Sequence, residues 1–170
     1  MTAPDAIGRE ALAHVDALYD HARRLTGNDP DAEELVQEAY ARALAGAHTY
    51  VAGNLKAWLF TILRNTFIDL HHRGRAKPVL GELDVLDGAD ERELFRDDLE
   101  LDRLRRLVAE DIEAALGSLS VDARAIILLD VEGFSETEVA AMLGCAVGTV
   151  KSRLSRARVL LREKLKDYAR

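Results

Sequence analysis

One segment near the C-terminal end constrains the fold more than any other part of this 170-residue chain. Ser135 and Glu138 have the S-x-x-E spacing of a capping box, which predicts that a helix begins there. Gly144 follows a short apolar stretch, and a glycine at that point allows the left-handed backbone of a tight corner between two helices. A second helix is predicted after the corner, with Val150 and Leu154 facing inward. The segment therefore predicts a helix-turn-helix.

The outward face of the second helix is basic and rich in hydroxyl groups. Such a face suits contacts with phosphates and with base edges in a major groove. A solvated basic helix in an ordinary helical hairpin is the alternative, but the small residues around the corner favour closely crossing helices. We predict that the DNA-binding residues of this helix are Thr149, Lys151, Ser152, Arg153, Ser155 and Arg156.

Apolar residues recur at intervals of three and four along most of the remaining chain. This periodicity predicts helices over about residues 8–25, 30–45, 55–73, 104–116 and 120–131. We therefore expect an all-α protein of two small helical domains, with three to four helices in the first and the helix-turn-helix in the second. The apolar faces of the predicted helices include Leu12, Val15, Leu44, Leu104, Leu107, Ile112 and Val131.

The middle of the chain lacks this periodicity. Residues 81–102 contain ten acidic and two basic side chains, a net charge of −8. A strongly charged segment with few regular apolar positions is typical of a flexible connection. We predict a first domain over residues 1–77, an acidic flexible linker over 78–102 and a second domain over 103–170.

The chain carries a net charge of −7, but its charges are segregated. Residues 56–77 carry +4 and residues 151–170 carry +6, whereas residues 1–40 carry −6. This pattern indicates two surfaces for nucleic acid and an acidic surface for a basic protein partner. Uneven charge arising by chance in a helical protein is the alternative.

Several functional classes find no support in the sequence. Cys145 is the one cysteine, so we expect neither a disulfide framework nor a cysteine metal site, and the adjacent His71 and His72 would point apart on a helix. We see no nucleophile–base arrangement and no glycine-rich phosphate loop, so we expect no enzyme activity, cofactor, metal or small-molecule substrate. No signal peptide or membrane-spanning run is visible, which predicts a cytoplasmic protein without membrane insertion.

Four segments resemble one family, in the family's order. They are residues 147–158 (VGTVKSRLSRAR), 23–27 (RRLTG), 32–38 (AEELVQE) and 55–65 (LKAWLFTILRN). Together they are similar to the extracytoplasmic-function sigma factors, members of the sigma-70 family of bacterial RNA polymerase. The resemblance covers about residues 10–77 and 103–167.

The resemblance implies a role for each domain. The first would be sigma region 2, which binds core RNA polymerase and melts the −10 element, and the second would be sigma region 4, which reads the −35 element. It also implies an anti-sigma factor as a partner, and a linker that follows the RNA exit path or serves as a plain tether. Acidic residues near Pro30 could instead favour the positive end of their helix. The implied polymerase contacts are Asp31, Glu33, Glu34, Gln37 and Glu38.

The resemblance also implies a pocket for a base flipped from the non-template strand. Asn65 matches the base-recognising position, and an amide both donates to and accepts from a base edge. Tyr50 matches an aromatic residue on which a base stacks, whereas Trp58 is more simply a core residue. The implied −10 contacts are Tyr50, Asn54, Trp58, Asn65, His71, His72 and Arg73.

Two positions depart from the family pattern. The loop over residues 50–58 is about one residue shorter than expected, which puts the −10 preference in question. Ala146 stands where proline or serine is common, and alanine is a poor N-cap. A stand-alone transcriptional regulator would bind DNA without polymerase, and an anti-regulator would not need two basic helices, so we favour a sigma factor that acts with core polymerase on promoter DNA.

Overall fold

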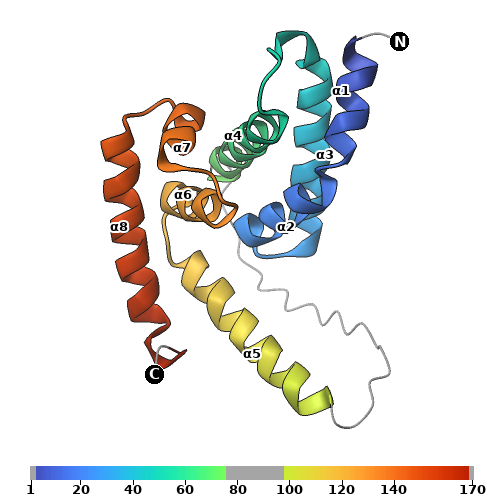
Figure 1. The fold of residues 1–170 in the computed structure, drawn as a ribbon. Coiled ribbons are helices and arrows are strands. Elements are labelled where there is room, and N and C mark those ends of the chain that lie inside the picture. Colours follow the sequence, from blue (N-terminus) through green and yellow to red (C-terminus); the bar gives the residue numbers. More distant parts are fainter. Residues whose placement is uncertain (1–2, 76–97, 169–170) are drawn as a thin grey trace.

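The computed structural model describes residues 3–75 and 98–168, which are helical and contain no strand (Figure 1). The first group of helices is α1 (Ala3–Leu12), α2 (Val15–Thr26), α3 (Asp29–Ala45), the short 3-10 helix η1 (Ala47–Thr49) and α4 (Leu55–Arg75). The second group is α5 (Asp98–Gly117), α6 (Val121–Val131), α7 (Glu136–Leu143), α8 (Val147–Lys164) and the 3-10 helix η2 (Lys166–Tyr168). The expected all-α fold is confirmed.

The helix ends follow signals that are visible in the sequence. The Asn28 side chain accepts a hydrogen bond from the backbone of Asp31 and so caps α3, with Pro30 in the first turn. Asn54 caps α4 in the same way, through the backbone N–H of Ala57 at 3.0 Å. These caps satisfy backbone donors that have no partner within the helix.

The core of the first domain lies between α2, α3 and α4. Leu18, Leu25, Leu35, Phe60 and Leu63 are each at most 1% exposed. The buried residues of α4 lie along one broad face of the helix, which packs into this core. Burial of this kind fixes the direction in which its remaining exposed side chains point.

The predicted helix over residues 8–25 is wrong in one respect, because the structure has two helices there. The carbonyl oxygen of Ala11 accepts hydrogen bonds from the Tyr40 hydroxyl at 2.6 Å and from the backbone N–H of His14 at 3.0 Å. The chain therefore turns at this point instead of continuing the α-helical pattern. Leu12 and Val15, expected in the core, are 63% and 37% exposed. Periodicity cannot reveal such a contact with a distant tyrosine.

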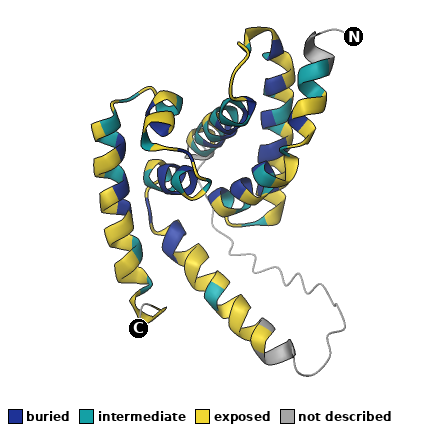
Figure 2. Cartoon of the chain, in the orientation of Figure 1, coloured by how far each residue is buried: buried dark blue, intermediate teal, exposed yellow. Residues whose placement is uncertain are grey.

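The second domain also departs from expectation at α5. This helix begins at Asp98, inside the predicted linker, and the rest of that linker lies outside the described residues. Leu104, Leu107 and Ile112 are 59%, 51% and 42% exposed, so α5 is mostly exposed (Figure 2). The apolar spacing correctly predicts that a helix forms, but it cannot show whether another element covers the apolar face. Leu44 and Val131, also predicted to be buried, are exposed as well.

The two groups of helices lie against each other, with α2 and α4 beside α6 and α7 (Figure 1). Within residues 3–75 and 98–168, none of the helices is both long and apolar enough to cross a membrane.

Candidate nucleic-acid interface

α7 and α8 form the helix-turn-helix that the sequence predicts. Ser135 Oγ accepts from the N–H of Glu138 at 3.2 Å, while the Glu138 carboxylate accepts from the N–H of Ser135 at 2.8 Å, which completes the capping box. The hydrogen bond from the Ser135 backbone N–H to the ionised carboxylate is the main reason why the pKa of Glu138 is lowered. Gly144 has a φ of 62°, the left-handed conformation expected at the corner. Val150 and Leu154 are at most 1% exposed, as predicted.

The outward face of α8 presents the predicted DNA-binding residues. Lys151, Ser152, Ser155 and Arg156 are exposed, and Thr149 and Arg153 are half-buried. Lys151 Nζ lies 3.6 Å from Glu136 Oε2 on α7, so part of its charge is already compensated. These side chains form one basic, hydroxyl-bearing surface on an element of the size that a major groove admits.

α4 presents a second candidate surface. Asn65 is exposed, and its Oδ1 accepts a hydrogen bond from Arg64 Nη1 at 3.1 Å. Asp69, one turn further on, pairs with Arg42 at 2.6 Å. The structure thus places Asn65 on the surface above a buried stripe, in agreement with its predicted orientation.

The predicted −10 residues after Asn65 lie at the end of the same helix. His72 and Arg73 are exposed, whereas His71 is half-buried and lies beside Phe67, with a ring-centroid distance of 6.1 Å. The ring centroids of His71 and His72 are 6.4 Å apart, and the ring planes are inclined at 70°. The stretch offers positive and hydrogen-bonding groups for phosphates.

The loop before α4 brings Tyr50 and Trp58 together, with ring centroids 5.1 Å apart and planes inclined at 50°. The Tyr50 hydroxyl donates to the carbonyl oxygen of Gly53 at 2.9 Å and accepts from its N–H at 3.1 Å. The short loop is therefore closed on itself by the tyrosine. Trp58 is half-buried and packs against the core, which agrees with the simpler interpretation of Trp58 as a core residue. Asn65 lies seven residues further along, about 10 Å up the helix axis.

The acidic face of α3 is largely exposed. Glu33, Glu34 and Gln37 are exposed, whereas Glu38 is half-buried and accepts from Arg42 Nε at 2.9 Å. Asp31 accepts from the Asn28 side chain at 2.7 Å. Asp31 therefore contributes to the start of its helix, in line with the alternative reading of the acids near Pro30.

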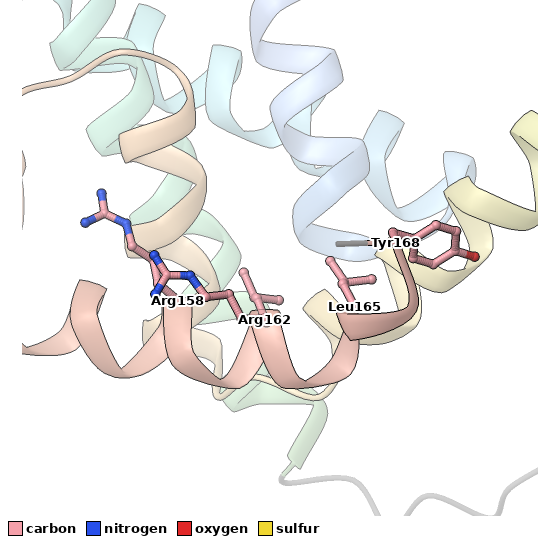
Figure 3. A pocket seen from close by; sticks show the side chains of 5 residues that line it. Arg158, Arg162, Leu165 and Tyr168 are labelled. Atoms are coloured by element: carbon pink, nitrogen blue, oxygen red, sulfur yellow. The ribbon is translucent and has the colours of Figure 1, made fainter. Parts of the chain in front are cut away.

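A shallow hollow of about 320 Å³ lies where α8 ends and η2 begins (Figure 3). Its lining is Arg158, Leu161, Arg162, Leu165 and Tyr168. Neither a carboxylate nor an imidazole lines it, so this hollow does not contain the acid–base pair that hydrolytic chemistry uses.

Sequence reasoning missed the residues that join the two domains. Arg124 on α6 donates to the carbonyl oxygen of Leu25 at 2.8 Å, and Arg64 pairs with Asp122. Burial is the main reason why the pKa of each arginine is lowered. No periodicity or local motif connects residues that are about sixty or a hundred positions apart, so only the fold shows these contacts.

Comparison with protein families gives two matches. The family described as Sigma-70 region 2 matches residues 11–77, and that described as Sigma-70, region 4 matches residues 109–161. The region 4 match includes the helix-turn-helix. The region 2 match includes the whole of α4, with Asn65, and the loop before it.

Individual proteins show the same similarity over nearly the whole chain. The ECF RNA polymerase sigma factor EcfG of Rhodopseudomonas palustris is 41% identical over 160 residues, which cover 93% of this chain and 84% of that protein. The ECF RNA polymerase sigma factor SigE of Mycolicibacterium smegmatis is 36% identical, and the match covers 92% of this chain but 60% of the relative.

Solved structures agree. The sigma factor RpoE in its complex with the anti-sigma factor NepR from Bartonella quintana has a TM-score of 0.69 and 39% identity, over 93% of this chain and 95% of that one. CnrH in complex with the cytosolic domain of CnrY has a TM-score of 0.68 and 25% identity, over 96% of this chain and 89% of that one.

Proposed function

Because the chain belongs to the extracytoplasmic-function (ECF) RNA polymerase sigma factors, we propose a division of labour between its two domains. As a sigma factor it directs promoter-specific transcription initiation by core RNA polymerase. The second domain, residues 103–170, reads the −35 element with α8. The first domain, residues 1–77, captures and melts the −10 element with α4 and the loop before it.

This proposal rests on the contrast between two exposed surfaces, each of which belongs to a helix whose other side is buried. α8 offers Lys151 and Arg156 above a buried Val150 and Leu154, which suits docking on intact duplex. α4 offers one exposed amide, Asn65, above a tightly packed core. A single amide held in place suits the capture of one base that has left the stack.

We further propose that core polymerase binds the exposed acidic face of α3. Glu33, Glu34 and Gln37 are available there, and a negative face is complementary to a basic partner. Since the similar Bartonella protein was solved with an anti-sigma factor, we expect a partner of that kind here too. The protein would act in the cytoplasm, beside core polymerase, without a catalytic step of its own.

The test is the Asn65→Ala variant, assayed with core polymerase on a promoter. A stand-alone regulator that only docks on duplex needs nothing from α4. A sigma factor must compensate for the few kcal/mol that unpairing and unstacking a base cost. We therefore expect Asn65→Ala to bind core polymerase and the −35 duplex normally, yet to form open complexes poorly and to discriminate less at one −10 base.

The measurement is permanganate footprinting of the melted bubble, beside binding to promoters matched and mismatched at that base. Asp69→Asn on the next turn shows the effect of a neighbouring change that leaves Asn65 in place, although it also removes the charge that pairs with Arg42. Normal melting with undiminished base preference in Asn65→Ala would show that this residue is a bystander. The flipped-base pocket would then belong to the loop over residues 51–54.

A further inference from the structure

The amide of Asn65 is exposed, but it is not free to turn either way. Arg64, the residue before it on α4, donates from Nη1 to Asn65 Oδ1 at 3.1 Å. A guanidinium carries donors and no acceptor, so the amide turns its oxygen toward Arg64 and its NH2 group away from it. The structure therefore gives the exposed amide a defined orientation.

The guanidinium of Arg64 is itself held in place. Its side chain is only 16% exposed, and its Nη2 lies 3.5 Å from Asp122 Oδ1. A planar guanidinium that is partly buried keeps the directions of its donors fixed relative to one another. The hydrogen bond to Asn65 joins consecutive residues of α4, so both partners belong to the same helix.

Two other polar side chains of the proposed pocket are engaged within their own loop. The Tyr50 hydroxyl donates to the carbonyl oxygen of Gly53 and accepts from its N–H. Asn54 Oδ1 accepts from the N–H of Ala57. Tyr50 thus offers a base its ring more than its hydroxyl, and polar recognition of a captured base depends mainly on Asn65.

The surface that Asn65 and Arg64 offer is one of donors and positive charge. Asp69, one turn further along, pairs with Arg42 at 2.6 Å, so its negative charge is largely compensated. Asn65 Oδ1 keeps a second lone pair, but a donor of a base that approached it would also approach the guanidinium. An acceptor of a base that approached the amide NH2 meets no such repulsion.

We propose that Arg64 is a positioning residue, which sets the amide of Asn65 to read a base edge with two neighbouring hydrogen-bond acceptors. The inference rests on the proposed function of Asn65 and adds the class of base that it recognises. Cytosine has neighbouring acceptors at N3 and O2, and guanine has them at O6 and N7. On the corresponding edges of adenine an acceptor lies beside the N6 amino group, and in thymine the N3–H donor separates the two acceptors. The captured base is therefore cytosine or guanine.

The experiment uses the holoenzyme that this chain forms with core polymerase, on a promoter fragment from which it initiates. The non-template strand is left single over the −10 element, and each of its positions carries each of the four bases in turn. At the position where Asn65→Ala loses discrimination, the parent should prefer cytosine or guanine by about 5- to 100-fold, the range of a good contact with a base edge. The four-base comparison also shows which of the two is captured.

Two substitutions of Arg64 test its positioning role. Arg64→Met keeps an unbranched, partly buried side chain but removes every donor, so the preference should fall to about threefold or less. Arg64→Lys can still donate to Asn65 Oδ1 and should retain part of the preference. Circular dichroism and core-polymerase binding show that each variant is folded.

Arg73→Ala is the matched control for a cation that only contacts phosphate. Arg73 is exposed near the end of the same helix, and its loss should weaken binding to all four templates by the same factor. If Arg64→Met behaved in this way and kept the ratio between bases, the positioning role would be overturned. A parent preference for adenine or thymine at that position would overturn it as well.

Failure of the inference is distinguishable from failure of the proposed function. If Asn65→Ala loses discrimination while Arg64→Met keeps it, Asn65 still reads a base and only the role of Arg64 is lost. If Asn65→Ala keeps full discrimination at every −10 position, the proposed function of Asn65 fails, and the inference fails with it.

Discussion

α4 and α8 are both proposed to contact DNA, but they are supported in different ways. α4 is packed by α2, α3 and α7, and its buried residues include Phe60, Leu63 and Thr66, each fully buried. α8 buries one narrow stripe, Val150, Leu154 and Ala157. The difference indicates that α4 is a rigid support, which suits the base capture proposed for Asn65. α8 is a surface helix whose long cations are free to move, which suits the contacts proposed with phosphates and base edges.

The largest expected effect tests the rigidity of α4. Phe60→Ala removes a ring that is 0% exposed and contacts both His21 and Phe134, so it should lower the free energy of unfolding by about 3–5 kcal/mol. Leu160→Ala on α8 is the control, because that side chain is 47% exposed and should change stability by less than about 0.5 kcal/mol. Urea denaturation of both variants gives the comparison. A similar change in the free energy of unfolding for the two variants would contradict the view that α4 is packed more tightly than α8.

The next effect tests the adaptable surface of α8. Arg156→Ala should weaken binding to a −35 duplex by about 1–3 kcal/mol if the guanidinium contacts a base. Lys151→Ala should fall at the lower end of that range, because Lys151 lies 3.6 Å from Glu136 and its charge is partly compensated without DNA. Titration at fixed salt measures both. Two variants that bind like the parent would show that the DNA-facing side of α8 has been misplaced.

The sequence predicts local features of the fold well and distant ones poorly. The capping box at Ser135 and the corner at Gly144 depend on neighbouring residues, and both are confirmed. The cap that Asn54 provides for α4 is equally local. The break between α1 and α2 depends on Tyr40, which lies 29 positions from Ala11, and was missed for that reason.

The same distinction applies to the candidate site. The exposure of Asn65 and Arg156 follows from helical periodicity, because each lies opposite a buried stripe. The hydrogen bond from Arg64 to Asn65 is local to α4, whereas the pairing of Arg64 with Asp122 requires two domains to meet. α5 shows the opposite failure. Periodicity predicts a helix with a buried apolar face, but no element of the described chain covers that face fully.

The smallest effect concerns how the two helices of the helix-turn-helix begin. α7 starts with a complete capping box, whereas α8 starts at Ala146, whose side chain makes no capping hydrogen bond although its backbone is already extended, with a φ of −70° and a ψ of 146°. A serine in that conformation can accept from the N–H groups of the first turn. Ser135→Ala should therefore lower the free energy of unfolding by about 1 kcal/mol, and Ala146→Ser should raise it by a similar or smaller amount.

Thermal unfolding of the two variants and of the double variant measures these changes. The effects should add, because the two caps satisfy different backbone donors on different helices. Ala146→Ser should leave the affinity for a −35 duplex nearly unchanged, since the cap lies before the basic face and alters none of its cations. A stabilised variant with much weaker DNA binding would show instead that the uncapped N–H groups at the start of α8 bind a phosphate, as helix N-termini can. In that case Ala146 would serve recognition, and α8 would engage DNA with its first turn as well as with its side chains.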